Sequence, residues 1–168
     1  MLSIVLVAAL AQSPDVVTQF NDVCVKSYPD MDAVRAVAKK AGWKQKKAPS
    51  AEDLASGTWS ESFEISDSRT LSLHSNEKRT YCSIVFGDEA TETKAFITAV
   101  EKQVSGVKRD KIAEDSWNKV GMEGTGNSAI VWRAPKAKKA VVSALVKKGD
   151  LAYDLLIGHP FFVGAKPE

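Results

Sequence analysis

The chain has 168 residues, of which 44% are hydrophobic and 26% are charged, and its formal net charge is +2. This length suits one domain with a real hydrophobic core, and this composition excludes a disordered or fibrous protein. The near balance of charge gives no strong nucleic-acid signal, and no apolar run reaches the roughly 18 to 20 residues that a membrane-spanning helix needs.

The first eleven residues are typical of an export signal. Residues 2–10 form an apolar run broken only by Ser3, and Ala9-Leu10-Ala11 provides the small residues that signal peptidase requires. The run is short and no Lys or Arg follows the first residue, so a buried N-terminal strand or helix is the alternative. We interpret residues 1–11 as a signal peptide and residues 12–168 as a single α+β domain with a periplasmic or secreted location.

The chain has two cysteines, Cys24 and Cys82. Two cysteines in an oxidising compartment are usually paired, so we predict a disulfide between them. The bridge would close a loop of roughly 58 residues, which stabilises a fold by about 4 kcal/mol. The alternatives are two buried thiols or thiolates on a metal. A zinc site with His74 and His159 would lack the closely spaced ligand pairs of structural zinc sites, so we predict no metal and no cofactor.

The residues after the export signal predict two helices. Ser13-Pro14-Asp15 is typical of a helix start, and core-facing positions then recur every three or four residues. These positions are Val16, Phe20, Val23, Cys24 and Ser27. The chain breaks at Tyr28-Pro29-Asp30, and a second helix ends with Gly42 as its cap. Its inward positions are Met31, Val34, Ala38 and Ala41. We expect an antiparallel helical pair, followed by a polar linker over residues 44–51.

The hydrophobic period then changes to two, which indicates strands. Three such runs are separated by short polar turns and predict an antiparallel meander. The expected inward residues are Trp59, Phe63, Ile65, Leu71, Leu73, Cys82, Ile84 and Phe86. His74 falls on the polar side of a strand that we expect at the edge of the sheet.

The second half of the chain predicts one further helix and more strands. Gly87-Asp88 opens the helix, Gly106 closes it, and strands are expected near residues 129–133 and 151–157. Residues 137–148 suit either a helix or a hairpin with the last strand, and we favour the hairpin. No internal repeat is visible. The predicted class is α+β, with an N-terminal helical pair and a mostly antiparallel sheet on which one further helix packs.

Motifs for catalysis are absent from the sequence. His74 and His159 are not accompanied by a nucleophile signature, and a solvated or structural role suits both. The glycine-rich residues 121–126 lack the Gly-Lys-Ser/Thr ending of a phosphate-binding loop, so they predict a loop between strands. No catalytic residue is predicted, and His159 is kept only as a candidate for binding.

The densest basic segment surrounds Trp43. Its lysines are Lys39, Lys40, Lys44, Lys46 and Lys47. An aromatic ring among cations is suited to stack and pair with nucleic acid, an anionic glycan or lipid headgroups. The alternative is a solvated loop after a helix, with Trp43 turned into the core. Trp43, Lys44, Lys46 and Lys47 are the candidate binding residues here.

Three short patterns resemble those of a known type of protein. Phe20-x-x-x-Cys24, Gly42-Trp43 and Tyr81-Cys82 together resemble small uncharacterised secreted proteins of Gram-negative bacteria. The resemblance implies a periplasmic address and a disulfide between a helix and a strand. It implies no active-site residues.

Three functions remain open at this point. The first is an exported, non-enzymatic binding or interaction protein, whose partner is an unknown small molecule or protein. The second is a periplasmic hydrolase-like enzyme whose site assembles in space around His159 or His74 with a carboxylate such as Asp154. The third is an envelope-surface protein that binds anionic polymers or lipids through the basic region around Trp43.

Overall fold

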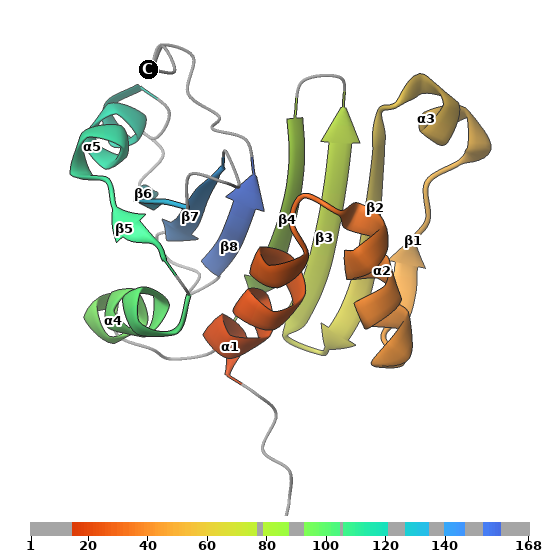
Figure 1. Ribbon diagram of the computed structural model, residues 1–168, viewed down its shortest axis with the longest axis horizontal. Coiled ribbons are helices and arrows are strands. Elements are labelled where there is room, and N and C mark those ends of the chain that lie inside the picture. The colour runs from red at the N-terminus through yellow and green to blue at the C-terminus, as the bar shows by residue number, and fades with distance from the viewer. Residues whose placement is uncertain are drawn as a thin grey trace, which may run out of the picture.

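The computed structural model describes residues 15–76, 79–87, 93–104, 106–120, 127–134, 140–146 and 153–158. Figure 1 shows its helices and strands. The helical segments are α1 (Val16–Phe20), the π-helical turn η1 (Asn21–Val25) that continues it, α2 (Met31–Lys40), α3 (Ala51–Ser56), α4 (Thr93–Gln103) and α5 (Lys111–Val120). The strands are β1 (Lys44–Lys47), β2 (Trp59–Ser66), β3 (Arg69–Asn76), β4 (Arg79–Phe86), β5 (Lys108–Arg109), β6 (Ser128–Arg133), β7 (Val141–Val146) and β8 (Tyr153–Gly158).

The strands form one eight-stranded sheet in the order β1-β2-β3-β4-β8-β7-β6-β5. Every neighbouring pair is antiparallel. The predicted meander is confirmed: Phe63 of β2 pairs with Leu71 of β3, which in turn pairs with Ile84 of β4. The favoured hairpin is also confirmed, because β7 pairs with β8. The α+β class therefore stands.

The sheet is built from two halves with the same order of elements. Each half has a helix, a short strand, a shorter helix and three longer strands. The first half is α2-β1-α3-β2-β3-β4, and the second is α4-β5-α5-β6-β7-β8. Each half runs from one edge of the sheet to its centre, where β4 and β8 meet (Figure 1). Gly42 after α2 and Gly106 after α4 both adopt a positive φ, of 73° and 76°. The topology is thus repeated, although the sequence shows no repeat.

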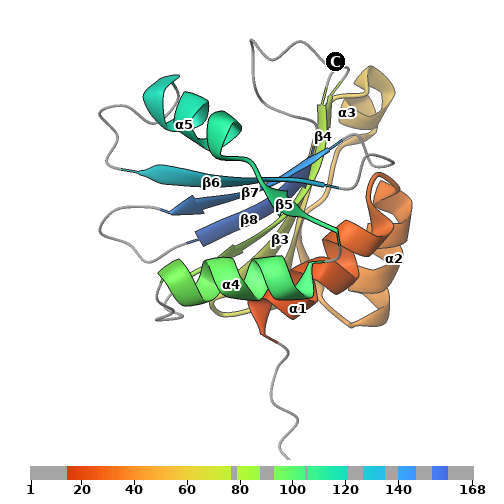
Figure 2. The same ribbon diagram turned by 60° about the vertical axis from the view of Figure 1, so that its left-hand side comes forward.

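One face of the sheet carries the hydrophobic core. Figure 2 shows α1, α2 and α4 on this side and α5 on the other. The inward residues of β2, β3 and β4 pack here against the helices, and the ring of Phe86 lies 5.8 Å from that of Phe96 in α4. The predicted disulfide joins Cys24 of η1 to Cys82 of β4, with Cα atoms 5.5 Å apart and both residues fully buried. It fastens the helical layer to the middle of the sheet.

The predicted helices are correct in place but differ at their ends. Asp15 is the N-cap of α1, and its carboxylate accepts hydrogen bonds from the backbone N–H groups of Val17 and Thr18. Ser13, Pro14 and residues 88–92 lie outside the described residues. The prediction that Ala41 faces inward is wrong, because it is exposed one residue beyond α2.

Two segments contain more structure than the sequence predicted. The expected polar linker over residues 44–51 holds β1 and the start of α3, and α3 begins with a capping box between Ser50 and Asp53. The charged stretch after α4 contains β5 and α5, and Asp110 begins α5 by accepting a hydrogen bond from the N–H of Ala113. The prediction of a single further helix was therefore wrong. None of the described helices has the length and apolar character needed to cross a membrane.

Candidate functional site

The side of the sheet that faces away from α1, α2 and α4 is rich in hydroxyl groups, and we call it the open face. Side chains alternate along each strand, so the residues between the core positions of β2, β3 and β4 point here. Ser62 pairs with Ser72, and Ser72 pairs with Ser83, which places three serines in a row across three strands. We call these residues the serine row. Ser62 and Ser72 are half-buried, whereas Ser83 is buried with 2% of its surface exposed, so the accessible hydroxyl groups of the row are those of β2 and β3.

An aromatic pair lies beside the serine row. His74 pairs with Tyr81 across β3 and β4, and their rings stack with centroids 4.9 Å apart. The prediction that His74 lies on an edge strand is wrong, because β3 lies between β2 and β4. Burial and the charge of Lys47 lower the pKa of His74, so the ring is neutral at neutral pH. Burial, with the charge of Asp154, raises the pKa of Tyr81.

The predicted basic residues lie along the edge of the sheet. Lys44, Lys46 and Lys47 form much of β1, where every residue is exposed. Lys46 makes a 2.5 Å ion pair with Glu64, and the Nζ of Lys47 donates to the Oγ of Ser60 at 2.7 Å. Two lysines are thus engaged with the neighbouring strand, at the rim of the open face.

Trp43 and His159 were the other candidate binding residues. Trp43 is half-buried and packs against the hydrophobic core, and its backbone N–H donates to the carbonyl of Ala38. The indole ring therefore belongs to the core layer rather than to the group of lysine ammonium groups. His159 lies outside the described residues.

A pocket of about 210 Å³ lies beneath α5, on the same side of the sheet as the serine row. Its lining residues are Trp117, Ala129, Ser143, Ala144, Leu145 and Leu156. Leu156 pairs with Ser83 on one side and with Ser143 on the other. The pocket therefore begins where the serine row ends, and its walls are mostly apolar.

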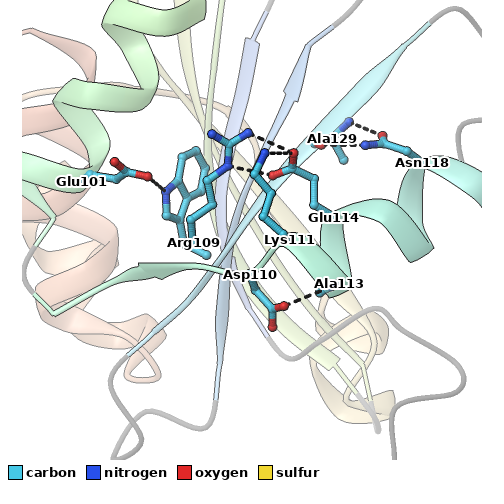
Figure 3. Close-up of polar contacts among 9 residues, drawn as sticks. Glu101, Arg109, Asp110, Lys111, Ala113, Glu114, Asn118 and Ala129 are labelled. Carbon is cyan, nitrogen blue, oxygen red and sulfur yellow. Dashed lines mark hydrogen bonds and ion pairs between the residues drawn. The ribbon is translucent and has the colours of Figure 1, made fainter.

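Polar contacts hold α5 over this pocket (Figure 3). The side chain of Asn118 donates to the carbonyl of Ala129 at 3.1 Å and accepts from its N–H at 2.8 Å. Glu114 accepts two hydrogen bonds from Arg109, at 3.0 and 2.9 Å, and one from Lys111 at 3.1 Å. Both ends of α5 are thereby tied to β5 and β6.

Glu114 is a charged anchor of α5. Burial alone would raise the pKa of its carboxyl group, but hydrogen bonds and positive charge from Arg109 and Lys111 outweigh burial. The pKa is therefore lower than its ordinary value, and the carboxylate stays ionised at neutral pH. The sequence predicted neither this anchor nor Trp117. The sequence did contain a signal for α5. Asp110 is a typical helix N-cap residue, and Ala113 and Trp117 are four residues apart, which is a helical spacing.

A second polar cluster lies on the helix-covered side of the sheet. Glu61 of β2 has only 3% of its side chain exposed, and it accepts hydrogen bonds from Arg35 of α2 and Gln45 of β1, each at 2.5 Å. The guanidinium of Arg35 lies 4.3 Å from the ring centre of Trp59 and also contacts Asp32. These contacts join α2, β1 and β2, and their burial suits a structural role.

Comparison with protein-family models, with curated proteins and with solved structures found no match for the chain. Among the described residues, no three His, Cys, Asp or Glu side chains gather as ligands for a metal ion. The chemistry of the open face and its pocket is therefore the basis for a proposal.

Proposed function

We propose that the protein is an exported, non-enzymatic binding protein and that the open face of its sheet is the binding surface. One observation carries this proposal: the serine row, the His74–Tyr81 pair and the apolar pocket lie side by side on one face. Ligand sites typically combine apolar walls with a few fixed polar groups. Here the polar groups stand on strands, which hold them rigidly.

The chemistry of His74 favours binding over hydrolysis. A catalytic histidine is hydrogen bonded to a nucleophile and oriented by an acid. The Nε2 of His74 instead lies 3.3 Å from the amide nitrogen of Asn76, and its ring stacks on Tyr81. A neutral stacked ring offers a flat surface and hydrogen bonding to a ligand.

The disulfide supports an exported location. Disulfides persist in oxidising compartments and are rare where thiols are kept reduced. The buried bond between Cys24 and Cys82 agrees with the signal peptide predicted over residues 1–11. We therefore propose that the protein is located in the periplasm or outside the cell, and mass spectrometry should find Gln12 at its N-terminus. Intact Met1 on protein recovered from the cytoplasm would contradict export.

Two variants test the binding surface, and each adds one arginine on a different side of the sheet. Ser72 lies in the serine row, and Ala36 lies exposed on α2 on the opposite side. Protein purified from its own compartment should carry a bound molecule that mass spectrometry identifies. Ser72→Arg should lose that molecule because the new side chain covers the serine row, and Ala36→Arg should keep it. Equal retention by both variants would refute the open face as the binding surface.

A further inference from the structure

The pocket beneath α5 has the size of a small ring. Apolar cavities of about 150 Å³ in other proteins stay dry and bind benzene. The pocket here measures about 210 Å³, and its walls include Trp117, Leu145 and Leu156. It therefore has room for one benzene-sized or slightly larger apolar group.

Small residues keep this space open. Protein interiors are normally packed to a density that leaves few voids. Ala129 and Ser143 line the pocket with short side chains, whereas branched residues would fill the same strand positions. The roof is fixed independently, because Asn118 of α5 is hydrogen bonded to the backbone of Ala129. The pocket is thus a built feature with a rigid roof and floor.

The open face changes from polar to apolar along one line of paired residues. The half-buried Ser62 and Ser72 present hydroxyl groups, Ser83 follows them and is buried, and Leu156 comes after Ser83 as the wall of the pocket. A ligand that lies along this line meets hydrogen-bonding groups at one end and an apolar pocket at the other.

We propose that the pocket binds an uncharged aromatic ring, and that the ligand of the open face is a molecule carrying such a ring next to a polar portion. The aromatic ring packs against Trp117 and the leucines, and the polar portion lies on the serine row. This inference rests on the proposed function, because it identifies the class of ligand for the same face.

The probe is benzyl alcohol, which is a ring of the required size, and glycerol is the polar comparison. Binding to the full mature chain is followed by saturation-transfer NMR and by tryptophan fluorescence. Ser143→Leu fills the pocket and should weaken binding of benzyl alcohol by roughly tenfold or more. Ser75→Leu is the matched control, because it makes the same change at a half-buried serine of β3 that points to the opposite side of the sheet, away from both the pocket and the serine row. It should leave the affinity for benzyl alcohol unchanged.

Ala129→Leu fills the pocket from β6 and guards against a folding defect in Ser143→Leu, with thermal unfolding as the check on both. Equal affinity of the wild-type chain and a folded, filled variant would overturn the proposal, as would binding of glycerol as strong as that of benzyl alcohol. The two proposals fail separately. If benzyl alcohol does not bind but Ser72→Arg still loses the native ligand, the pocket is wrong and the open face stands. If benzyl alcohol binds but Ser72→Arg keeps the native ligand, the open face is wrong as the native site.

Discussion

Glu61 brings a carboxylate into the layer between α2 and the sheet, where 3% of its side chain is exposed. A buried charge is tolerated only when it is paired and hydrogen bonded. Arg35 and Gln45 each occupy one oxygen of the carboxylate, and the guanidinium of Arg35 also lies over the ring of Trp59. The pair therefore fixes the position of α2 over the first half of the sheet.

Removing only Arg35 should destabilise the fold much more than replacing both Arg35 and Glu61. Arg35→Met leaves the carboxylate of Glu61 buried without its cation, which we expect to lower the free energy of unfolding by about 3 to 5 kcal/mol. Arg35→Met combined with Glu61→Leu should recover most of this loss, because the charge is gone. Urea unfolding followed by circular dichroism measures all three proteins.

An exposed ion pair provides the control. Lys26 and Asp22 are paired on the surface of the N-terminal helix, with 67% and 52% of their side chains exposed. Lys26→Met should therefore cost less than about 1 kcal/mol. A loss in Arg35→Met no greater than that in Lys26→Met would show that the buried pair does not hold α2 in place.

The alternation of residues placed Glu61 on the inward side, between Trp59 and Phe63. Charged residues are seldom buried, and Glu61 was not among the predicted inward residues. The partner that makes burial acceptable is Arg35, 26 residues earlier and on a helix. A local pattern cannot reveal such a pairing, whereas it did reveal the apolar members of the same strand.

Among the elements, β1 lacks a hydrophobic period, whereas α5 has one that the prediction did not use. The sequence of β1 is Lys-Gln-Lys-Lys, which has no inward apolar residue. It is a strand because β2 offers backbone partners at the edge of the sheet, and lysines there discourage pairing with other chains. The contacts that fix α5 come from Glu114 and Asn118, whose partners lie on other elements. The apolar residues of α5, such as Ala113 and Trp117, nevertheless recur at helical spacing, and this period is about as strong as that of α2 and no weaker than that of α4. The helix was missed although its apolar pattern was present in the sequence.

Acid should release α5 from β5 and β6. The folded-state pKa of Glu114 is lower than its ordinary value of 4.5, so its contribution to stability is fully present above that value. It is lost as the pH falls below 4.5 and through the folded-state pKa, because protonation removes the ion pairs with Arg109 and Lys111. Asp110, whose pKa is also lowered, acts in the same direction. The free energy of unfolding should therefore fall as the pH drops below the ordinary carboxyl pKa of 4.5 and through the lower folded-state pKa of Glu114.

Two variants distinguish the contribution of Glu114 from the general loss of stability in acid. Glu114→Gln should be less stable at neutral pH and lose less stability on acidification, because one of the two groups no longer titrates. Asp115→Asn changes the exposed neighbouring carboxylate of the same helix and should follow the wild-type profile. Identical acid profiles for Glu114→Gln and the wild-type chain would rule out Glu114 as the pH-sensitive anchor.

For the whole molecule, the two halves of the sheet meet at β4 and β8. The pairing of Ile84 with Leu155 lies at this junction, and both residues are fully buried. β4 contains Ser-Ile-Val-Phe followed by Gly87, and β8 contains Asp-Leu-Leu-Ile followed by Gly158. The two strands share a hydrophobic pattern but few identical residues, which explains why the sequence did not reveal the repeated topology. The antiparallel sheet and the disulfide were predictable because they depend on alternation and on a single pair of cysteines.

The disulfide is a covalent bond within the first half of the sheet and its helices. The described residues of the second half contain no such bond. Cys24 lies in η1 and Cys82 in β4, so the bond joins the N-terminal helical layer to the centre of the sheet. The chain between them includes α2, α3 and most of the first half, and opening this loop increases the freedom of the unfolded chain. Replacing both cysteines with serine should therefore lower the free energy of unfolding by about 2 to 5 kcal/mol.

Urea unfolding of the double serine variant and of the oxidised wild-type chain gives this difference directly. The reduced wild-type chain is the control for the two substitutions, because it loses the covalent bond but keeps both sulfur atoms in the core. The reduced chain and the double variant should both be less stable than the oxidised chain, since both lack the constraint on the unfolded state. Treatment with a thiol reagent under denaturing, non-reducing conditions should label neither cysteine in protein from its own compartment. Labelling of both would mean that the thiols are free there, and the proposed location in an oxidising compartment would lose its main support.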